Sequence, residues 1–141
     1  MIQKRRMLSL AAFSALAAGA TLSLALLAQV GGPSLPQDKG PAKLNVSGYP
    51  KDIQKDYKIF REKCEQCHTL ARPLNTSMSR DAWERYVKRM MHKPNSGISP
   101  DQGKKIFEFL IYDQENRKDK NPKEFYPALS DEQIQQMEKG Q

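Results

Sequence analysis

The sequence predicts a small all-α domain that follows an apolar N-terminal segment. Apolar residues recur at helical spacing in separate stretches between residues 51 and 117, and residues typical of helix caps precede several of these stretches. The first 30 residues contain a long uncharged run that is not part of the globular fold. The predicted domain is too short to bury a large hydrophobic core, so we expect another component to complete its interior.

The first 30 residues have the form of a signal peptide or a membrane anchor. A basic cluster at residues 4–6 precedes an uncharged stretch over residues 7–30 that is dominated by Leu and Ala. A cleaved signal normally has an apolar core of about 7 to 15 residues, whereas about 20 residues span a bilayer. The length favours an uncleaved transmembrane anchor, while the small residues Ser23 and Ala25 leave cleavage after Ala25 open. Because the basic cluster stays in the cytoplasm, both outcomes place the rest of the chain on the extracytoplasmic, periplasmic side.

Residues 31–50 are predicted to be a flexible linker. The stretch is rich in Gly, Pro, Lys, Ser and Asn, and its prolines exclude a continuous helix. We therefore expect it to tether the helical domain to the N-terminal segment.

A first helix is expected to begin at Asp52, which is a good N-cap residue. Three apolar residues and one cysteine then recur at helical spacing and share one face of this helix: Ile53, Tyr57, Phe60 and Cys64. The helix leads directly into a cysteine motif, so it sets the position of the first thiol.

Residues 69–75 are predicted to form a loop. Pro73 lacks a backbone N–H, and it biases Arg72 away from helical geometry. We expect a backbone carbonyl near Pro73 to accept the Nδ1 hydrogen of His68, which would fix the tautomer of that ring.

Two further helices carry clear start signals. Ser79 is expected to cap a helix that ends before Pro94, and Ser99-Pro100-Asp101-Gln102 combines a cap, a proline at the first helical position and a glutamine at the third. We expect the second of these helices to end near Arg117. Their apolar faces are formed by Trp83, Tyr86, Val87, Met90 and Met91 in one, and by Ile106, Phe107, Phe109, Leu110 and Ile111 in the other.

Residues 118–141 are predicted to be a C-terminal extension. Residues 118–123 are charged and contain Pro122, so we expect little ordered structure there. Ser130-Asp131-Glu132-Gln133 has the form of a capping box and predicts a short helix. The expected organisation is a signal peptide or anchor over residues 1–30, a linker over 31–50, the helical domain over 51–117 and the extension over 118–141.

The pentapeptide Cys64-Glu65-Gln66-Cys67-His68 is the main chemical signal of the chain. Two thiols three positions apart reach the two vinyl groups on one edge of a haem, and the adjacent imidazole then binds the iron. A thioredoxin-like redox pair would need a strand–helix–strand context, and a zinc site would need four ligands, for which His92 is the only further usual candidate. The motif therefore predicts one covalently attached haem c.

The stretch from residue 49 to about residue 117 resembles a mono-haem c-type cytochrome, of the small class I-like kind found in bacteria. The resemblance rests on the amphipathic helix that leads into Cys-x-x-Cys-His, the proline loop and the capped last helix. It implies that Cys64 and Cys67 attach the haem and that His68 is the proximal iron ligand. It also implies that the first and last helices cross, so that Phe60 meets Phe109 or Leu110.

Met90 is the expected distal iron ligand. It follows Trp83 by seven residues, so the indole and the thioether share one helical face. Small bacterial cytochromes c with Trp, six residues and then Met are similar, and in them this Met is the ligand. Met91, His92 and a vacant sixth position stay open as alternatives, because a methionine on an apolar helix face usually fills core space. Trp83 and Pro73 are expected to pack beside the haem.

The resemblance implies electron transfer rather than an independent enzyme activity. Ligation by His and Met raises the reduction potential of haem iron and suits a one-electron carrier. The expected partners are redox proteins or a respiratory or photosynthetic membrane complex. Residues 31–141 carry 20 basic and 16 acidic residues, and their net charge of +4 is compatible with an acidic partner or an anionic membrane surface. We find no nucleic-acid-binding motif in the sequence. The alternative is a haem-based sensor or gas-binding module with an open or labile sixth position.

Overall fold

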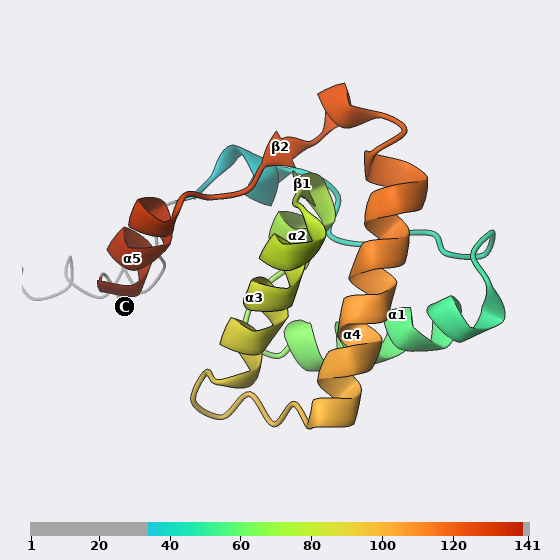
Figure 1. Cartoon of the computed structure of the whole chain (residues 1–141), viewed down its shortest axis with the longest axis horizontal. Helices are drawn as coiled ribbons and strands as arrows, with labels where there is room; N and C mark the ends of the chain where they lie inside the picture. Colours follow the sequence, from blue (N-terminus) through green and yellow to red (C-terminus); the bar gives the residue numbers. More distant parts are fainter. Residues whose placement is uncertain (1–33, 140–141) are drawn as a thin grey trace, which may run out of the picture.

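Helices make up most of the part of the chain that the computed structural model describes, residues 34–139 (Figure 1). The predicted signal peptide or anchor over residues 1–30 lies outside these residues. The described α-helices are α1 (Lys51–Cys64), α2 (Ala71–Asn75), α3 (Arg80–Met91), α4 (Pro100–Asp113) and α5 (Asp131–Lys139). Within residues 34–139, no helix has both the length and the apolar character needed to cross a membrane.

The core lies where α1 crosses α4, and its centre is aromatic (Figure 1). Phe60 of α1 and Phe109 of α4 are fully buried, and their ring centroids are 5.0 Å apart. The ring of Tyr57 packs on the same Phe109 ring at 4.9 Å. Burial of each such ring contributes about 1.5–3 kcal/mol. The contact between Phe60 and Phe109 that the resemblance implies is therefore confirmed.

Helix α3 lies beside α4 and runs in the opposite direction (Figure 1). The capping residues of three helices are those that the sequence predicts. The Ser79 side chain accepts a hydrogen bond in the first turn of α3, Ser99 and Gln102 form a capping box at α4, and Ser130 and Gln133 form the same pair of bonds at α5. Each cap satisfies backbone N–H groups that have no partner within the helix.

Helix α1 begins at Lys51 and not at the predicted cap. Pro50 occupies the N-cap position, and Asp52 lies in the first turn of the helix. A carboxylate in the first turn still interacts favourably with the positive end of the helix dipole. Asp52 therefore marks the beginning of α1 correctly, although it is not the N-cap residue.

The prediction of a loop over residues 69–75 is wrong for most of this segment. Residues 71–75 form the short helix α2, with Pro73 at its third position. The first N–H groups of a helix have no intrahelical acceptor, so a proline in the first turn removes no hydrogen bond. The bias that Pro73 exerts on Arg72 is overcome by tertiary contacts, because Leu70, Ala71 and Leu74 are all buried.

The segment after α4 is ordered, contrary to the prediction for residues 118–123. Helix α4 continues into a π-helix, η2 (Gln114–Lys118), which agrees with an end near Arg117, and a 3-10 helix, η3 (Pro122–Glu124), follows. Strand β2 (Tyr126–Pro127) then pairs in parallel with β1 (Thr76–Ser77). Composition suggested disorder here, but Lys118 is fully buried and anchors the segment.

The described part of the predicted linker contacts the helical domain. A 3-10 helix, η1 (Pro36–Lys39), lies against α2, where Asp38 forms an ion pair with Arg72 at 2.6 Å. The side-chain amide of the buried Asn75 donates hydrogen bonds to the backbone carbonyls of Gln37 and Pro41. Prolines exclude a long helix in this stretch, but they do not prevent specific contacts of this kind.

Candidate functional site

The cysteine motif lies at the C-terminal end of α1. Cys64 is the last residue of the helix, and Cys67 and His68 lie in the turn that follows it. Cys64 is half-buried against the core, whereas Cys67 and His68 are exposed. Both cysteines are free thiols in this structure. One thiol therefore faces the interior of the domain while the other thiol and the imidazole lie at its surface.

The surroundings of Cys64 stabilise a protonated thiol. Burial raises the pKa of Cys64 to about 12, and Cys67 and Glu65 act in the same direction. The negative end of the α1 dipole lies at this residue, whereas reactive redox cysteines are commonly activated at helix N-termini. The arrangement therefore disfavours a thioredoxin-like thiolate at Cys64.

The imidazole of His68 has a defined hydrogen-bond partner. Its Nδ1–H donates to the backbone carbonyl of Thr69 at 2.8 Å. The acceptor is thus not a carbonyl near Pro73, as predicted, because α2 uses that region of the chain for helical structure. The consequence for the ring is the expected one: the proton is on Nδ1, and Nε2 carries the lone pair that a metal ion requires.

The 3-10 helix η1 lies close to His68. The pKa of Asp38 is lowered, first by its hydrogen bond with Arg72 and in small part by the charge of His68. Arg72 donates to both carboxylate oxygens of Asp38, at 2.7 and 2.6 Å. An ion pair between Asp38 of the predicted linker and Arg72 of the helical domain therefore lies near the imidazole.

A hydrogen bond and an electrostatic effect show that the end of α1 lies near α3 and near the loop after it. Burial raises the pKa of Tyr86 in α3, and the nearby Cys64 contributes to this shift. The ammonium group of Lys63 donates to the backbone carbonyl of Gly97 at 2.8 Å. Met90 follows Tyr86 by one helical turn. The cysteine end of α1 and the methionine end of α3 therefore lie on the same side of the molecule.

The three candidates for the distal ligand have different surroundings. Met90 and Met91 are both half-buried against the core, whereas His92 is exposed, with its Nδ1 bonded to the Lys88 carbonyl at 2.6 Å. A Cβ atom placed on Gly103 of α4 would collide with Sδ of Met91. Met91 is therefore already engaged in packing between α3 and α4.

Trp83 and Pro73 are both in the interior. The indole of Trp83 is fully buried, donates its Nε1–H to Gln114 at 3.1 Å, and contacts Tyr86 edge-on with ring centroids 5.5 Å apart. Tyr86 thus packs on Trp83 and lies near enough to Cys64 for that thiol to influence its pKa. The backbone carbonyl of Pro73 accepts a hydrogen bond from Lys118.

Sequence reasoning missed a buried polar network around Asp113 and Lys118. Both side chains are fully buried, and Lys118 Nζ lies 3.5 Å from Asp113 Oδ2. Arg117 donates two hydrogen bonds to the same carboxylate, and the Tyr49 hydroxyl donates a third at 2.8 Å. A lysine within a charged run gives no sequence signal of burial, so only the position of Asp113 at helical spacing hinted at this network.

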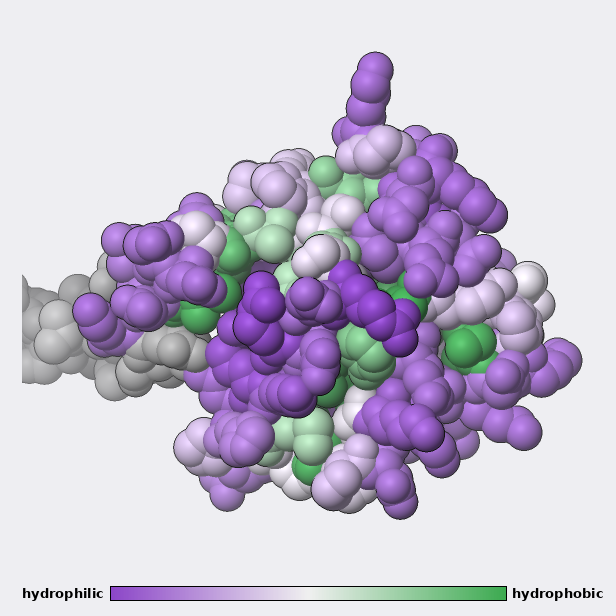
Figure 2. Space-filling model, viewed as in Figure 1, coloured by the Kyte–Doolittle hydropathy of each residue, from purple (hydrophilic) through white to green (hydrophobic). Residues whose placement is uncertain are grey.

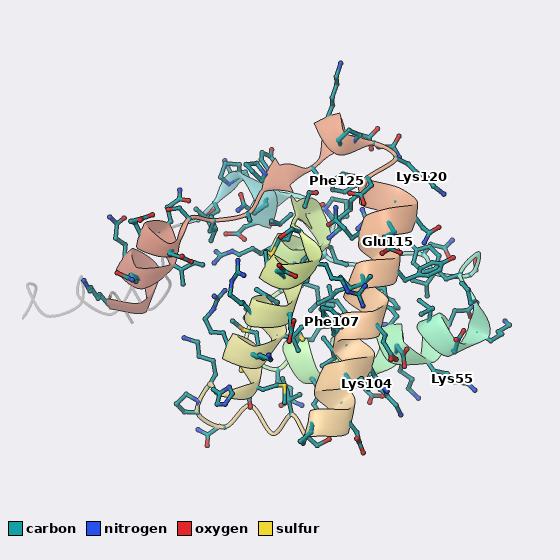
Figure 3. All side chains as sticks on the ribbon, viewed as in Figure 1. Lys55, Lys104, Phe107, Glu115, Lys120 and Phe125 are labelled. Carbon is teal, nitrogen blue, oxygen red and sulfur yellow. The ribbon has the colours of Figure 1, made fainter. Side chains whose placement is uncertain are left out.

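Two surface hollows lie away from the cysteine motif. Figure 2 shows a largely polar surface with small apolar patches on this face of the molecule. The larger hollow, of about 620 Å³, lies between α1 and α4, and Lys55, Phe107 and Glu115 are among the residues that line it (Figure 3). The smaller one lies between Ser77 and Asp119. Neither includes Cys64, Cys67 or His68, so the motif is a separate surface feature.

The donor set of the motif fits a covalently attached haem. It offers two thiols three residues apart and an imidazole whose Nε2 has a lone pair, at the edge of a helical core. Among residues 34–139, no three His, Cys, Asp or Glu side chains group together in a way that would hold a single metal ion. Comparisons with protein-family models, with curated proteins and with solved structures found no significant match.

Proposed function

We propose that this protein is an extracytoplasmic mono-haem c-type cytochrome that transfers single electrons between redox partners. The observation that carries the proposal is the Cys64-Glu65-Gln66-Cys67-His68 motif at the end of a helix that crosses α4 through the Phe60–Phe109 contact. The crossing of the first and last helices is the arrangement that the family resemblance implies. The Thr69 carbonyl adds support, because it directs Nε2 of the histidine toward metal binding.

Cys64 and Cys67 would hold the haem through thioether bonds, and Nε2 of His68 would bind the iron. When bound, the haem supplies a one-electron couple, since its iron is stable in both the ferric and the ferrous state. The chain itself provides the protonated, half-buried Cys64 thiol and the oriented imidazole. Cys67 is exposed together with its polar neighbours Gln66 and His68, so this edge is accessible to a partner protein.

Met90 is the proposed distal ligand, with Met91 and His92 as the alternatives. Met90 continues the face of α3 on which Tyr86 approaches Cys64, whereas Sδ of Met91 packs on Gly103. Met91 is therefore placed toward α4, whereas Met90 lies one turn after the residue that is near Cys64. A soft thioether ligand favours reduced iron, which suits a high-potential electron carrier.

The proposed partners are a periplasmic redox protein and a membrane electron-transfer complex, with the cytochrome acting as a tethered carrier or as a subunit. The apolar stretch over residues 7–30 supports the tether, and the net charge of +4 on residues 31–141 supports an acidic docking surface on the partner. We propose no enzyme activity of its own.

The experiment is expression of the full chain in cells that export it and attach haem to Cys-x-x-Cys-His sequences. The purified protein is denatured and extracted with acidified acetone. We expect one haem to stay with the polypeptide, and the protein to show a reversible one-electron titration. Haem that leaves completely with the solvent would refute the proposal.

His68→Ala and His92→Ala form a matched pair for this test. Both histidines are exposed, and in both Nδ1 bonds a backbone carbonyl. We expect His68→Ala to change the visible spectrum and lower the reduction potential, and His92→Ala to leave both unchanged. A wild-type iron that is high-spin and binds carbon monoxide readily would instead favour the gas-binding alternative.

A further inference from the structure

Lys118 is an unusual residue in this fold, because its ammonium group is completely buried. It is the last residue of η2, which continues α4 without a break (Figure 1). Its Nζ donates hydrogen bonds to the backbone carbonyls of Pro73 and Thr76, each at 2.8 Å. Burial lowers the pKa of Lys118 to about 8, and Asp113 opposes this shift. Burying the charge of a lysine costs desolvation free energy, which its hydrogen bonds and its ion pair must offset.

The two carbonyls belong to the end of α2, the segment that follows His68. The last carbonyls of a helix have no intrahelical partner, and a five-residue helix such as α2 is not stable by itself. Lys118 satisfies the carbonyls of Pro73 and Thr76, and Arg117 satisfies the carbonyl of Leu74 at 2.8 Å. Two cations from η2 thus complete the C-terminal end of α2.

The same ammonium group contacts α3. Nζ of Lys118 lies 4.6 Å from the centroid of the Trp83 ring, within the range of a cation–π interaction. Gln114, one helical turn earlier, accepts the indole N–H of the same ring and also the backbone N–H of Met78. Lys118 therefore lies between the segment that carries on from His68 and the helix that leads to Met90.

We propose that Lys118 is a positioning residue of the haem site, which holds the segment after His68 and the Trp83 ring of α3 in one fixed arrangement. The inference rests on the proposed function, since it assumes that His68 and Met90 bind the iron of one haem. The Asp113 carboxylate lies 3.5 Å from Nζ of Lys118, and it also accepts hydrogen bonds from Arg117 and from the Tyr49 hydroxyl. The effect of Lys118 on the iron is thus indirect and operates through α2 and α3.

The test uses the full-length, haem-loaded protein and its Lys118→Met and Lys118→Arg variants. Lys118→Met keeps the apolar stem but removes the donors and the charge. We expect deuterium exchange in the peptide spanning residues 69–78 to become about tenfold faster or more, as for the loss of a buried charge-assisted hydrogen bond. We also expect the weak charge-transfer band of thioether-bound ferric haem to be lost at lower temperature and the midpoint potential to fall. Lys118→Arg should restore much of both signals.

Two control variants separate positioning from general stability. Tyr49→Phe removes one hydrogen bond to Asp113 but leaves every contact of Lys118 in place. It should lower the melting temperature without altering the haem band or the exchange of residues 69–78. Lys120→Met removes an exposed charge two residues further along (Figure 3) and should change neither signal.

The outcomes separate this inference from the proposed function. Wild-type protein without covalent haem overturns the proposed function and this inference with it. Haem-loaded Lys118→Met with wild-type exchange and a wild-type band overturns this inference alone. If Lys118→Met does not fold, Lys118→Gln is measured instead: its shorter, uncharged side chain should shift both signals in the same direction, and wild-type values in both would overturn the proposal.

Discussion

The turn that contains Cys64, Cys67 and His68 and the network around Asp113 and Lys118 are opposite kinds of site. The turn is mostly exposed, and its residues lie within five positions of the chain. The network is fully buried at its two central charges, and it joins α2, α3 and the end of α4. The turn leaves its donor groups exposed, and the proposed function assigns them to a cofactor, whereas the network satisfies its own charges.

This difference teaches how to interpret each region. A binding motif is defined by the spacing of its donors, which a sequence displays directly. A buried ion pair has its effect only in the folded state, where desolvation and hydrogen bonding set its energy. Changes in the turn should therefore act on the cofactor first, and changes in the network should act on the fold first.

Replacing both Cys64 and Cys67 by Ala should have the largest effect. We expect no covalent haem and a severe loss of folded protein, because the proposed haem would form part of a small core. Haem content and the yield of protease-resistant domain measure this directly. A yield equal to that of the wild type would mean that the domain folds without haem. Changes in the turn would then affect only the cofactor, and changes in the network only the fold.

Asp113→Leu should cost about 3–5 kcal/mol of unfolding free energy, because it leaves the buried Lys118 without its carboxylate. Glu115→Leu, at an exposed acidic position two residues away, should change stability by no more than about 0.5 kcal/mol. Denaturant unfolding of the haem-loaded variants measures both. Equal stabilities for the two variants would show that the network adds nothing to the fold.

Met90→Ala and Met91→Ala should each lower the unfolding free energy by about 1–2 kcal/mol, less than for a fully buried methionine, because both side chains are half-buried. Their effects on the haem should differ. We expect Met90→Ala to abolish the charge-transfer band of the ferric protein and to lower the midpoint potential. Met91→Ala should only loosen the packing on Gly103. The reverse pattern would move the ligand by one residue, and loss of the ligand signal in His92→Ala alone would indicate two histidine ligands.

Asp38→Asn should have the smallest effect, about 1 kcal/mol or less at neutral pH, because the ion pair with Arg72 is partly exposed. The folded-state pKa of Asp38 lies below its usual value of 3.8. The stabilisation is therefore present above that value and is lost as the pH falls through the lowered folded-state pKa. Unfolding measured from pH 7 to pH 2 should show a weaker acid dependence in the variant, and curves that stay parallel would contradict this account.

The serine helix caps were predicted correctly because they depend on local sequence alone. Ser79, Ser99 and Ser130 cap helices where the sequence predicts them, because a cap depends on residues only three positions apart. Pro73 was misinterpreted because its effect depends on where the helix begins, and buried neighbours such as Leu70 and Leu74 decide that. The segment 118–123 was misinterpreted because a charged composition does not reveal which charge finds a buried partner.

The amino-acid sequence by itself determined the spacing of Cys64, Cys67 and His68, the starts of α3, α4 and α5, and the apolar faces that meet at Phe60 and Phe109. These features depend on spacing along the chain. Only the tertiary structure decided that Lys118 is buried against α2 and Trp83, and that the Asp38 side chain pairs with Arg72. The physical reason is that such contacts join residues more than thirty positions apart, and their free energy arises from desolvation and geometry that exist only after the helices have packed.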